Sequence, residues 1–141
     1  MKKIAFIFAT LAMFTSFVLT SCEKEYEFVA PRAKSIAIAP NPCYEGDTVL
    51  AYVLYEDMGQ YWYFTKQTYT LDGNVISDKT KPEGGALNDH AEYHFIVSGV
   101  GEHTISFSSQ ISPYAGKSNP FQTGPSATGR FTVLPKEQKQ E

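Results

Sequence analysis

An all-β fold is predicted by three features of the sequence. Between residues 34 and 135, short runs rich in β-branched and aromatic residues alternate with Gly, Pro, Asn and Asp. None of these runs repeats its apolar residues with the 3.6-residue period of an amphipathic helix. Asp72 and Gly73 lie between two such runs. This pair is a strong hairpin signal, because Gly readily adopts the positive φ of a tight turn.

Alternating apolar and polar residues predict seven strands in this region. They are expected at residues 35–39, 48–56, 61–71, 75–77, 93–97, 103–108 and 129–134. The run at 48–56 is apolar on both faces, so we expect it inside a sheet rather than at an edge. Seven strands in about a hundred residues have the size and spacing of an immunoglobulin-like β-sandwich.

The first 21 residues have the layout of a secretory signal peptide. Lys2 and Lys3 form a positive start, and residues 4–19 form an apolar run interrupted by Thr and Ser. This run is shorter than the about 20 mostly apolar residues that a membrane-spanning helix requires. The alternatives are an uncleaved anchor and a soluble secreted chain.

The signal ends in Leu19-Thr20-Ser21-Cys22, which resembles a bacterial lipobox. In that pattern an aliphatic residue and two small residues precede an obligatory Cys, whose thiol receives a diacylglycerol before the chain is cut in front of it. The resemblance implies that residues 1–21 are removed and that Cys22 holds the protein in a membrane. Residues 22–33 would then be the lipidated N-terminus and a tether, residues 34–135 the sandwich, and residues 136–141 a charged tail.

A charged, mainly acidic stretch follows Cys22 closely and contains Glu23, Lys24, Glu25 and Glu27. This start resembles the export signals of surface-exposed lipoproteins of Bacteroidetes. The resemblance implies a place in the cell envelope, at the outer membrane, with surface exposure as a further expectation. The alternative is a solvated linker.

Two motifs resemble immunoglobulin-like and PKD-like domains of exported Bacteroidetes proteins. Residues 69–75, Tyr-Thr-Leu-Asp-Gly-Asn-Val, are similar to their strand-turn-strand, and residues 101–107, Gly-Glu-His-Thr-Ile-Ser-Phe, are similar to their penultimate strand. The resemblance covers residues 34–134 and implies a single antiparallel sandwich. Antibody domains have a Cys pair between the sheets, which this sequence lacks, and His103 stands where their tyrosine corner has an aromatic residue.

The charge of the mature chain limits the partners that are expected, and its length limits the number of domains. Without Lys2 and Lys3, ten basic residues face 15 acidic ones, which gives a net charge of about −5 for a mature chain of 120 residues. The basic residues are scattered, so no stripe is available to neutralise a row of phosphates, and nucleic acid is not expected as a partner. This length allows one domain.

If Cys22 carries lipid, Cys43 has no partner within the chain. The surrounding residues read as a turn that leads into a strand, and none of them would lower the pKa of the thiol. We therefore expect Cys43 to act as a small apolar filler. An intermolecular disulfide is the alternative.

Neither a metal site nor a catalytic site is expected. In a strand, His90 and His94 would lie about 13 Å apart, too far to bind one ion, and no Cys or acidic cluster accompanies them. His103 is expected to be structural, with its ring packed at a corner and a nitrogen bonded to the backbone. The Asp residues lie beside turn residues, and no Ser lies in a nucleophile motif. We expect neither an enzyme nor a cofactor.

The segment Tyr61-Trp62-Tyr63-Phe64 is more aromatic than a sandwich core requires. Alternation would send Tyr61 and Tyr63 to one face and Trp62 and Phe64 to the other. One pair would then be free to stack on a sugar ring or to anchor a protein partner. The alternative is that both faces are covered.

Asp47-Thr48-Val49 resembles the tripeptide that is O-glycosylated in exported Bacteroidetes proteins. Initiation of a strand after Gly46 explains the same residues without a sugar.

The function expected from these observations is that of a membrane-anchored, non-catalytic binding or accessory module. It would meet the membrane through the lipid on Cys22, and its other partner would be a glycan or another envelope protein. A structural subunit of a surface assembly and a carbohydrate-binding module are the alternatives.

Overall fold

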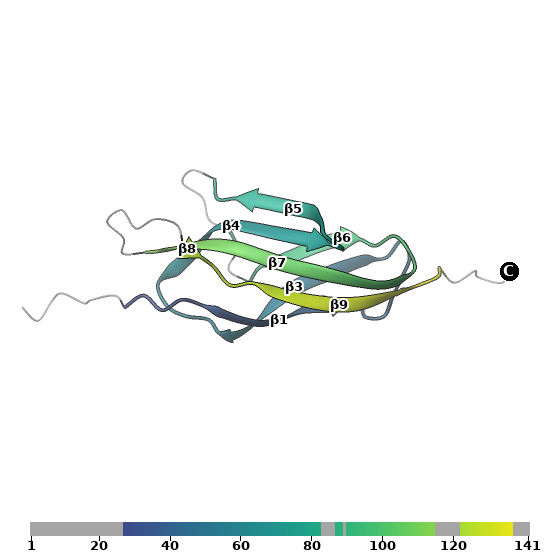
Figure 1. Ribbon diagram of the computed structural model, residues 1–141, viewed down its shortest axis with the longest axis horizontal. Coiled ribbons are helices and arrows are strands. Elements are labelled where there is room, and N and C mark those ends of the chain that lie inside the picture. Colours follow the sequence, from purple (N-terminus) through teal and green to yellow (C-terminus); the bar gives the residue numbers. More distant parts are fainter. Residues whose placement is uncertain (1–26, 83–86, 89, 115–121, 137–141) are drawn as a thin grey trace, which may run out of the picture.

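The described residues of the computed structural model, 27–82, 87–88, 90–114 and 122–136, form two packed β-sheets (Figure 1). The smaller sheet contains, in spatial order, β1 (Arg32–Ala39), β3 (Thr48–Asp57) and β6 (Glu92–Ile96). The larger sheet contains β2 (Cys43–Tyr44), β9 (Ala127–Leu134), β7 (Gly101–Pro113), β4 (Trp62–Leu71) and β5 (Asn74–Thr80), with β8 (Gln122–Thr123) beside β7. The predicted all-β fold and its two-sheet packing are confirmed.

Each of the seven expected strands is present. The strand that was expected inside a sheet is β3, which lies between β1 and β6. β2 and β8 are two short additional strands; β2 lies in the expected turn around Cys43, and β8 lies between the last two expected strands. β1 begins at Arg32, inside the expected tether, because Arg32 pairs with Asp57 of β3. The hairpin between β4 and β5 is confirmed, and Asp72 and Gly73 both have positive φ, 49° and 85°.

A β-bulge in β4 determines which aromatic side chains are buried. The pairing of β4 with β7 shifts register between Phe64 and Lys66. Trp62 and Phe64 are buried before this shift, and Gln67 and Tyr69 are buried after it. The extra residue therefore lets even-numbered and then odd-numbered side chains point into the core.

The strands run along the long axis, so the sandwich has two distinct ends (Figure 1). At one end Val29 exchanges two backbone hydrogen bonds with Gln60, with N–O distances of 3.0 and 2.9 Å. Gly59 lies beside this pair with a φ of 65°, and a Cβ atom there would lie 2.2 Å from the Val29 carbonyl oxygen. Glycine is therefore required at this point. We call this the N-terminal end.

The opposite end contains the turn at Asp72 and Gly73, the loop before β7 and the segment around Glu45. β9 also finishes here, where the Leu134 carbonyl accepts a hydrogen bond of 2.9 Å from the Glu45 N–H. We call this the C-terminal end.

Candidate functional site

Two residues of the aromatic segment belong to the core. Trp62 is 9% exposed and Phe64 is 1% exposed. Their rings meet edge to face with centroids 4.8 Å apart, and Phe64 packs in the same way on Phe107. The Trp62 indole N–H also donates a hydrogen bond of 2.6 Å to the Met58 carbonyl. A contact surface therefore cannot use Trp62 or Phe64 while the core is intact.

The other two residues of the segment lie nearer the solvent. Tyr61 precedes β4 with a φ of 56°, so strand alternation does not extend to it, and it is exposed. Tyr63 is half-buried between Tyr114, whose ring centroid is 5.3 Å away, and the Lys81 ammonium, 5.0 Å from the ring centroid. The Tyr114 N–H donates a hydrogen bond of 2.9 Å to the Tyr61 carbonyl. Exposed aromatic rings are thus gathered at the N-terminal end.

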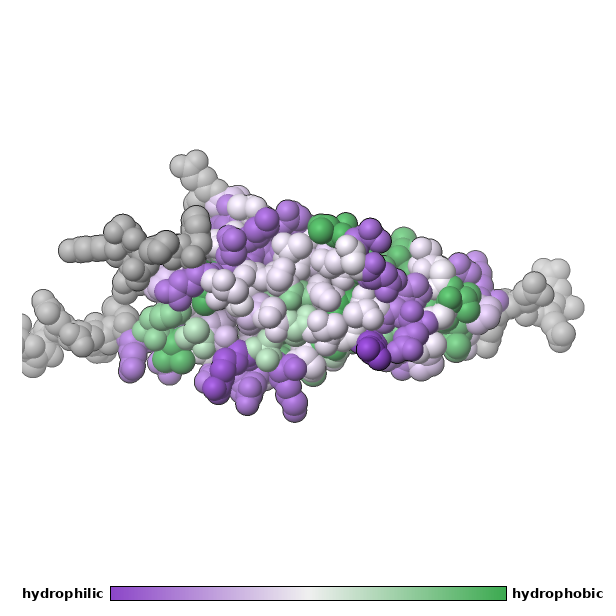
Figure 2. Space-filling model, in the orientation of Figure 1, coloured by the Kyte–Doolittle hydropathy of each residue, from purple (hydrophilic) through white to green (hydrophobic). Residues whose placement is uncertain are grey.

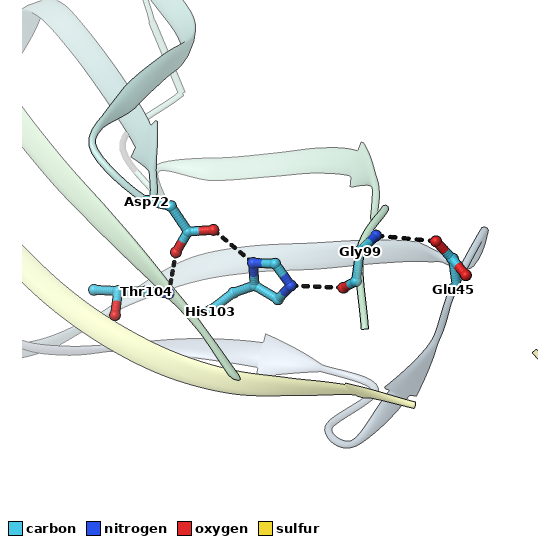
Figure 3. A network of polar contacts seen from close by, with 5 residues as sticks. All are labelled: Glu45, Asp72, Gly99, His103 and Thr104. Carbon is cyan, nitrogen blue, oxygen red and sulfur yellow. Dashed lines mark hydrogen bonds and ion pairs between the residues drawn. The ribbon is translucent and has the colours of Figure 1, made fainter. Parts of the chain in front are cut away.

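At the C-terminal end, His103 is the centre of a polar network (Figure 3). Its Nδ1 lies 2.5 Å from a carboxylate oxygen of Asp72, and its Nε2 lies 2.6 Å from the Gly99 carbonyl oxygen. The second carboxylate oxygen of Asp72 accepts a hydrogen bond of 2.9 Å from the Thr104 N–H. The Gly99 N–H donates one of 3.1 Å to the Glu45 carboxylate. The network therefore connects the hairpin turn, the loop before β7 and the segment before β3.

The network favours a protonated His103. Both of its ring nitrogens face acceptors, so both are satisfied as donors only in the imidazolium form. The hydrogen bond to Asp72, followed by that to Gly99, raises the pKa of His103 above 6.5. The Thr104 N–H, followed by His103, lowers the pKa of Asp72 below 3.8. Each group thus stabilises the charged form of the other, so the contact is an ion pair over a wider pH range than two isolated groups would allow.

The ring of His103 also stacks on Phe131, with centroids 5.5 Å apart. The expectation that His103 packs at a corner and bonds the backbone is confirmed. Its pairing with Asp72, 31 residues away, was not predicted, since Asp72 was assigned to the turn alone. A carboxylate at a hairpin turn and a His near the start of a later strand are the only signals in the sequence that point to this pairing.

The other two histidines are separate from this network. His94 is exposed in β6, and His90 precedes that strand. Within the described ranges, no group of three His, Cys, Asp or Glu residues lies close enough to hold a metal ion.

Cys43 is fully buried in β2, where its thiol lies 3.6 Å from the Thr132 carbonyl oxygen. Burial raises the pKa of the thiol, and the charge of nearby Asp47 raises it further. The expected role as a buried filler is confirmed. A thiol with a raised pKa forms little thiolate, so we expect low reactivity in the folded domain.

Thr48 is exposed at the first position of β3. The Asp47 carboxylate accepts a hydrogen bond of 2.9 Å from the Tyr44 N–H, which is a turn contact. These positions fit strand initiation and leave Thr48 accessible, and its O-glycosylation stays a prediction.

A shallow polar hollow of about 240 Å³ lies on the outer face of the larger sheet, lined by Lys66, Thr68, Ser108, Ser109, Gln110 and Thr123. Thr68 donates a hydrogen bond of 3.0 Å to Asp78, and Lys66 approaches the same carboxylate at 3.4 Å. Figure 2 shows the middle of this face as pale, neither strongly hydrophilic nor strongly hydrophobic. Its hydroxyl and amide groups are suited to small polar ligands.

A scan against protein-family models finds no match to this chain, and a search of curated proteins finds no similar sequence. Among the described residues, no helix is long and apolar enough to cross a membrane. The expected signal peptide and residues 22–26 of the expected tether, including the lipidation site Cys22, lie outside the described residues.

Proposed function

We propose that this chain is a lipid-anchored, non-catalytic binding module of the cell envelope, with its partner surface at the C-terminal end. The observation that carries the proposal is the His103 network, which holds three separate chain segments together at one end. Binding residues are commonly found on loops that a rigid scaffold positions. Both ring nitrogens of His103 are engaged within the network, so neither is available as a base. The network therefore serves to position the loops that it connects.

The strand order supports an immunoglobulin-like type of sandwich. If the seven longer strands are named A, B, C, C′, E, F and G, one sheet contains A, B and E, and the other contains G, F, C and C′. Constant-type immunoglobulin domains likewise separate A, B and E from C, F and G. The fourth strand differs, since β5 pairs with β4 in the larger sheet.

The anchor is tested by Cys22→Ala. If Cys22 is the lipidation site, this variant accumulates as an uncleaved precursor and takes up no labelled palmitate. Labelling equal to that of the unchanged protein would remove the lipid anchor from the proposal.

The partner surface is tested by placing a photo-cross-linking amino acid at Val100, which is 55% exposed at the C-terminal end. We expect it to capture an envelope component in living cells. The matched control carries the same cross-linker at Thr128, which is exposed in the middle of the larger sheet. Equal capture at both positions would contradict a partner surface at the C-terminal end.

The polar hollow favours carbohydrate binding as a second candidate function. Sugar hydroxyls form hydrogen bonds with the Ser, Thr and Gln groups found there. Titration with a panel of soluble oligosaccharides tests this function. We expect any binding to be lost in Thr68→Ala with Gln110→Ala and kept in Thr128→Ala, and binding unaffected by the double change would exclude the hollow.

The open edge at β5 favours a structural subunit as the remaining alternative. β5 is seven residues long and lies at the outer edge of the larger sheet. An uncovered edge strand offers backbone groups to another chain. Proline at Asp78 would weaken assembly through that edge and leave capture at Val100 unchanged.

A further inference from the structure

Three exposed side chains at the N-terminal end gather where the chain enters the sandwich. Met58 is 42% exposed, Tyr61 is 43% exposed and Tyr114 is 68% exposed. The backbone of Tyr114 is bonded to that of Tyr61, and the carbonyl of Met58 accepts the indole N–H of Trp62, the next residue after Tyr61. We call these three residues the aromatic tip.

The chain itself limits how far the aromatic tip can lie from Cys22. Val29 is seven residues from Cys22 in the sequence. An extended chain covers at most about 3.6 Å per residue, so Val29 lies within about 25 Å of Cys22. Val29 is bonded to Gln60, the residue before Tyr61. A lipid on Cys22 would therefore keep the aromatic tip close to the bilayer surface.

The opposite end is separated from this entry point by the length of the sandwich. β7 is 13 residues long and runs between the two ends. A strand rises about 3.4 Å per residue, so β7 spans about 44 Å, well beyond the reach of the tether.

We propose that the aromatic tip rests on the headgroup region of the membrane that holds Cys22, so that the C-terminal end points away from it. This proposal depends on the lipid anchor of the proposed function. Tyr combines an apolar ring with a polar hydroxyl, which is why it is enriched at membrane interfaces. Met adds a flexible apolar side chain.

Apolar insertion, rather than charge, drives this contact. The Lys81 ammonium lies beside the tip, over the ring of Tyr63. Exposed Glu27 and Glu56 precede Val29 and Met58 by two residues each, and they oppose attraction to anionic lipids. The contact is therefore expected in neutral membranes and should not become stronger when anionic lipid is added.

The fluorescence of Trp62 provides the test, because Trp62 is the one Trp in the chain. Its indole N–H bonds to the carbonyl of Met58, a residue of the aromatic tip. The naturally processed protein is placed in phosphatidylcholine vesicles with brominated acyl chains, and flotation records anchoring. We expect the bromines to quench Trp62, and we expect that quenching to be lost when Met58, Tyr61 and Tyr114 are all changed to Ser. The matched control changes Val75, Ile96 and Val100 to Ser, three exposed apolar residues outside the tip, and it should be quenched like the unchanged protein.

The possible results separate this proposal from the anchor on which it depends. Protein that floats without quenching, or that is quenched equally in both triple variants, contradicts the membrane contact and leaves the anchor in place. Protein that does not float removes the anchor and this proposal together. Tyr114→Ser is a milder variant, and it should reduce the quenching even if the triple change disturbs folding.

Discussion

The two ends of the sandwich are built from opposite kinds of interaction. At the N-terminal end, aromatic rings continue from the core through Trp62 to the exposed Tyr61 and Tyr114. At the C-terminal end, the hairpin turn is held by His103, Asp72 and Gly99 through polar contacts near the solvent. Aromatic packing is therefore the main side-chain contribution at one end, and a polar side-chain network is the main contribution at the other.

This difference has energetic consequences. Burial of aromatic side chains contributes several kcal/mol for each residue, whereas a solvent-exposed ion pair contributes about 0–1 kcal/mol. We therefore expect global stability to depend on the N-terminal half of β4, and the order of the loops to depend on the polar network. The first three predictions test this division, from the largest expected effect to the smallest.

The largest effect is expected within the aromatic segment. Changing Trp62 or Phe64 to Ala should lower the free energy of unfolding by about 3–5 kcal/mol, because a large cavity remains in the core. Tyr61→Ala is the control, and its effect should stay within about 0.5 kcal/mol because the residue is exposed. Urea unfolding measures all three. If Trp62→Ala were as mild as Tyr61→Ala, Trp62 would not belong to the core.

An intermediate effect is expected at two glycines, one at each end. Gly59 and Gly73 both have positive φ, and Ala at either position carries the strain of that conformation. At Gly59 a Cβ atom would also lie 2.2 Å from the Val29 carbonyl oxygen, whereas at Gly73 it meets no atom within 4 Å. Each substitution should cost about 1 kcal/mol from strain, with an additional cost at Gly59.

Thermal unfolding and hydrogen exchange at Val29 distinguish these two glycine variants. Gly59→Ala should accelerate exchange at Val29, and Gly73→Ala should leave it unchanged. Equal destabilisation by both variants, with no change at Val29, would mean that the entering chain is not fixed at this end.

The smallest effect is a pH dependence at the C-terminal end. The pKa of His103 is higher in the folded domain than its ordinary value of 6.5, so the contact stabilises fully below pH 6.5. That stability is lost as the pH rises through the folded pKa. The pKa of Asp72 is lower than its ordinary value of 3.8, so its contribution is present above pH 3.8 and is lost as the pH falls through its folded pKa.

Stability from this network should therefore be greatest between pH 3.8 and pH 6.5 and should decline toward alkaline pH. Urea unfolding at pH values from within that range upward through the folded pKa of His103 measures the decline, which should be about 1 kcal/mol or less. His103→Gln is the control, and it should remove the decline. A decline of the same size in the variant would assign it to another group.

Much of the fold could be predicted from the sequence, because alternation and turn residues are local signals. The hairpin at Asp72 and Gly73 follows from the φ values that Gly tolerates, and the central position of β3 follows from its two apolar faces. The bulge after Phe64 could not be predicted, since it depends on pairing with β7, more than 40 residues away.

The functional residues could not be predicted in full for the same reason, because their positions also depend on contacts between segments far apart in the sequence. Alternation separated Trp62 and Phe64 from Tyr63, but it could not show which face the other sheet covers. The contact between Asp72 and His103 joins a hairpin turn to the start of a strand 31 residues later. Neither Met58 nor Tyr114 stands out in the sequence, because their common position at one end depends on the packing of separate loops.

The orientation of the two ends relative to the membrane is the central claim, and energy transfer from each end to a lipid dye measures it most directly. A fluorophore is attached to Met58→Cys in one sample and to Val100→Cys in another, while Cys43 is buried and Cys22 carries the lipid. The lipidated proteins are then placed in vesicles that contain an acceptor in the headgroup region. We predict strong transfer from position 58 and weak transfer from position 100, and equal transfer from both positions would contradict this orientation.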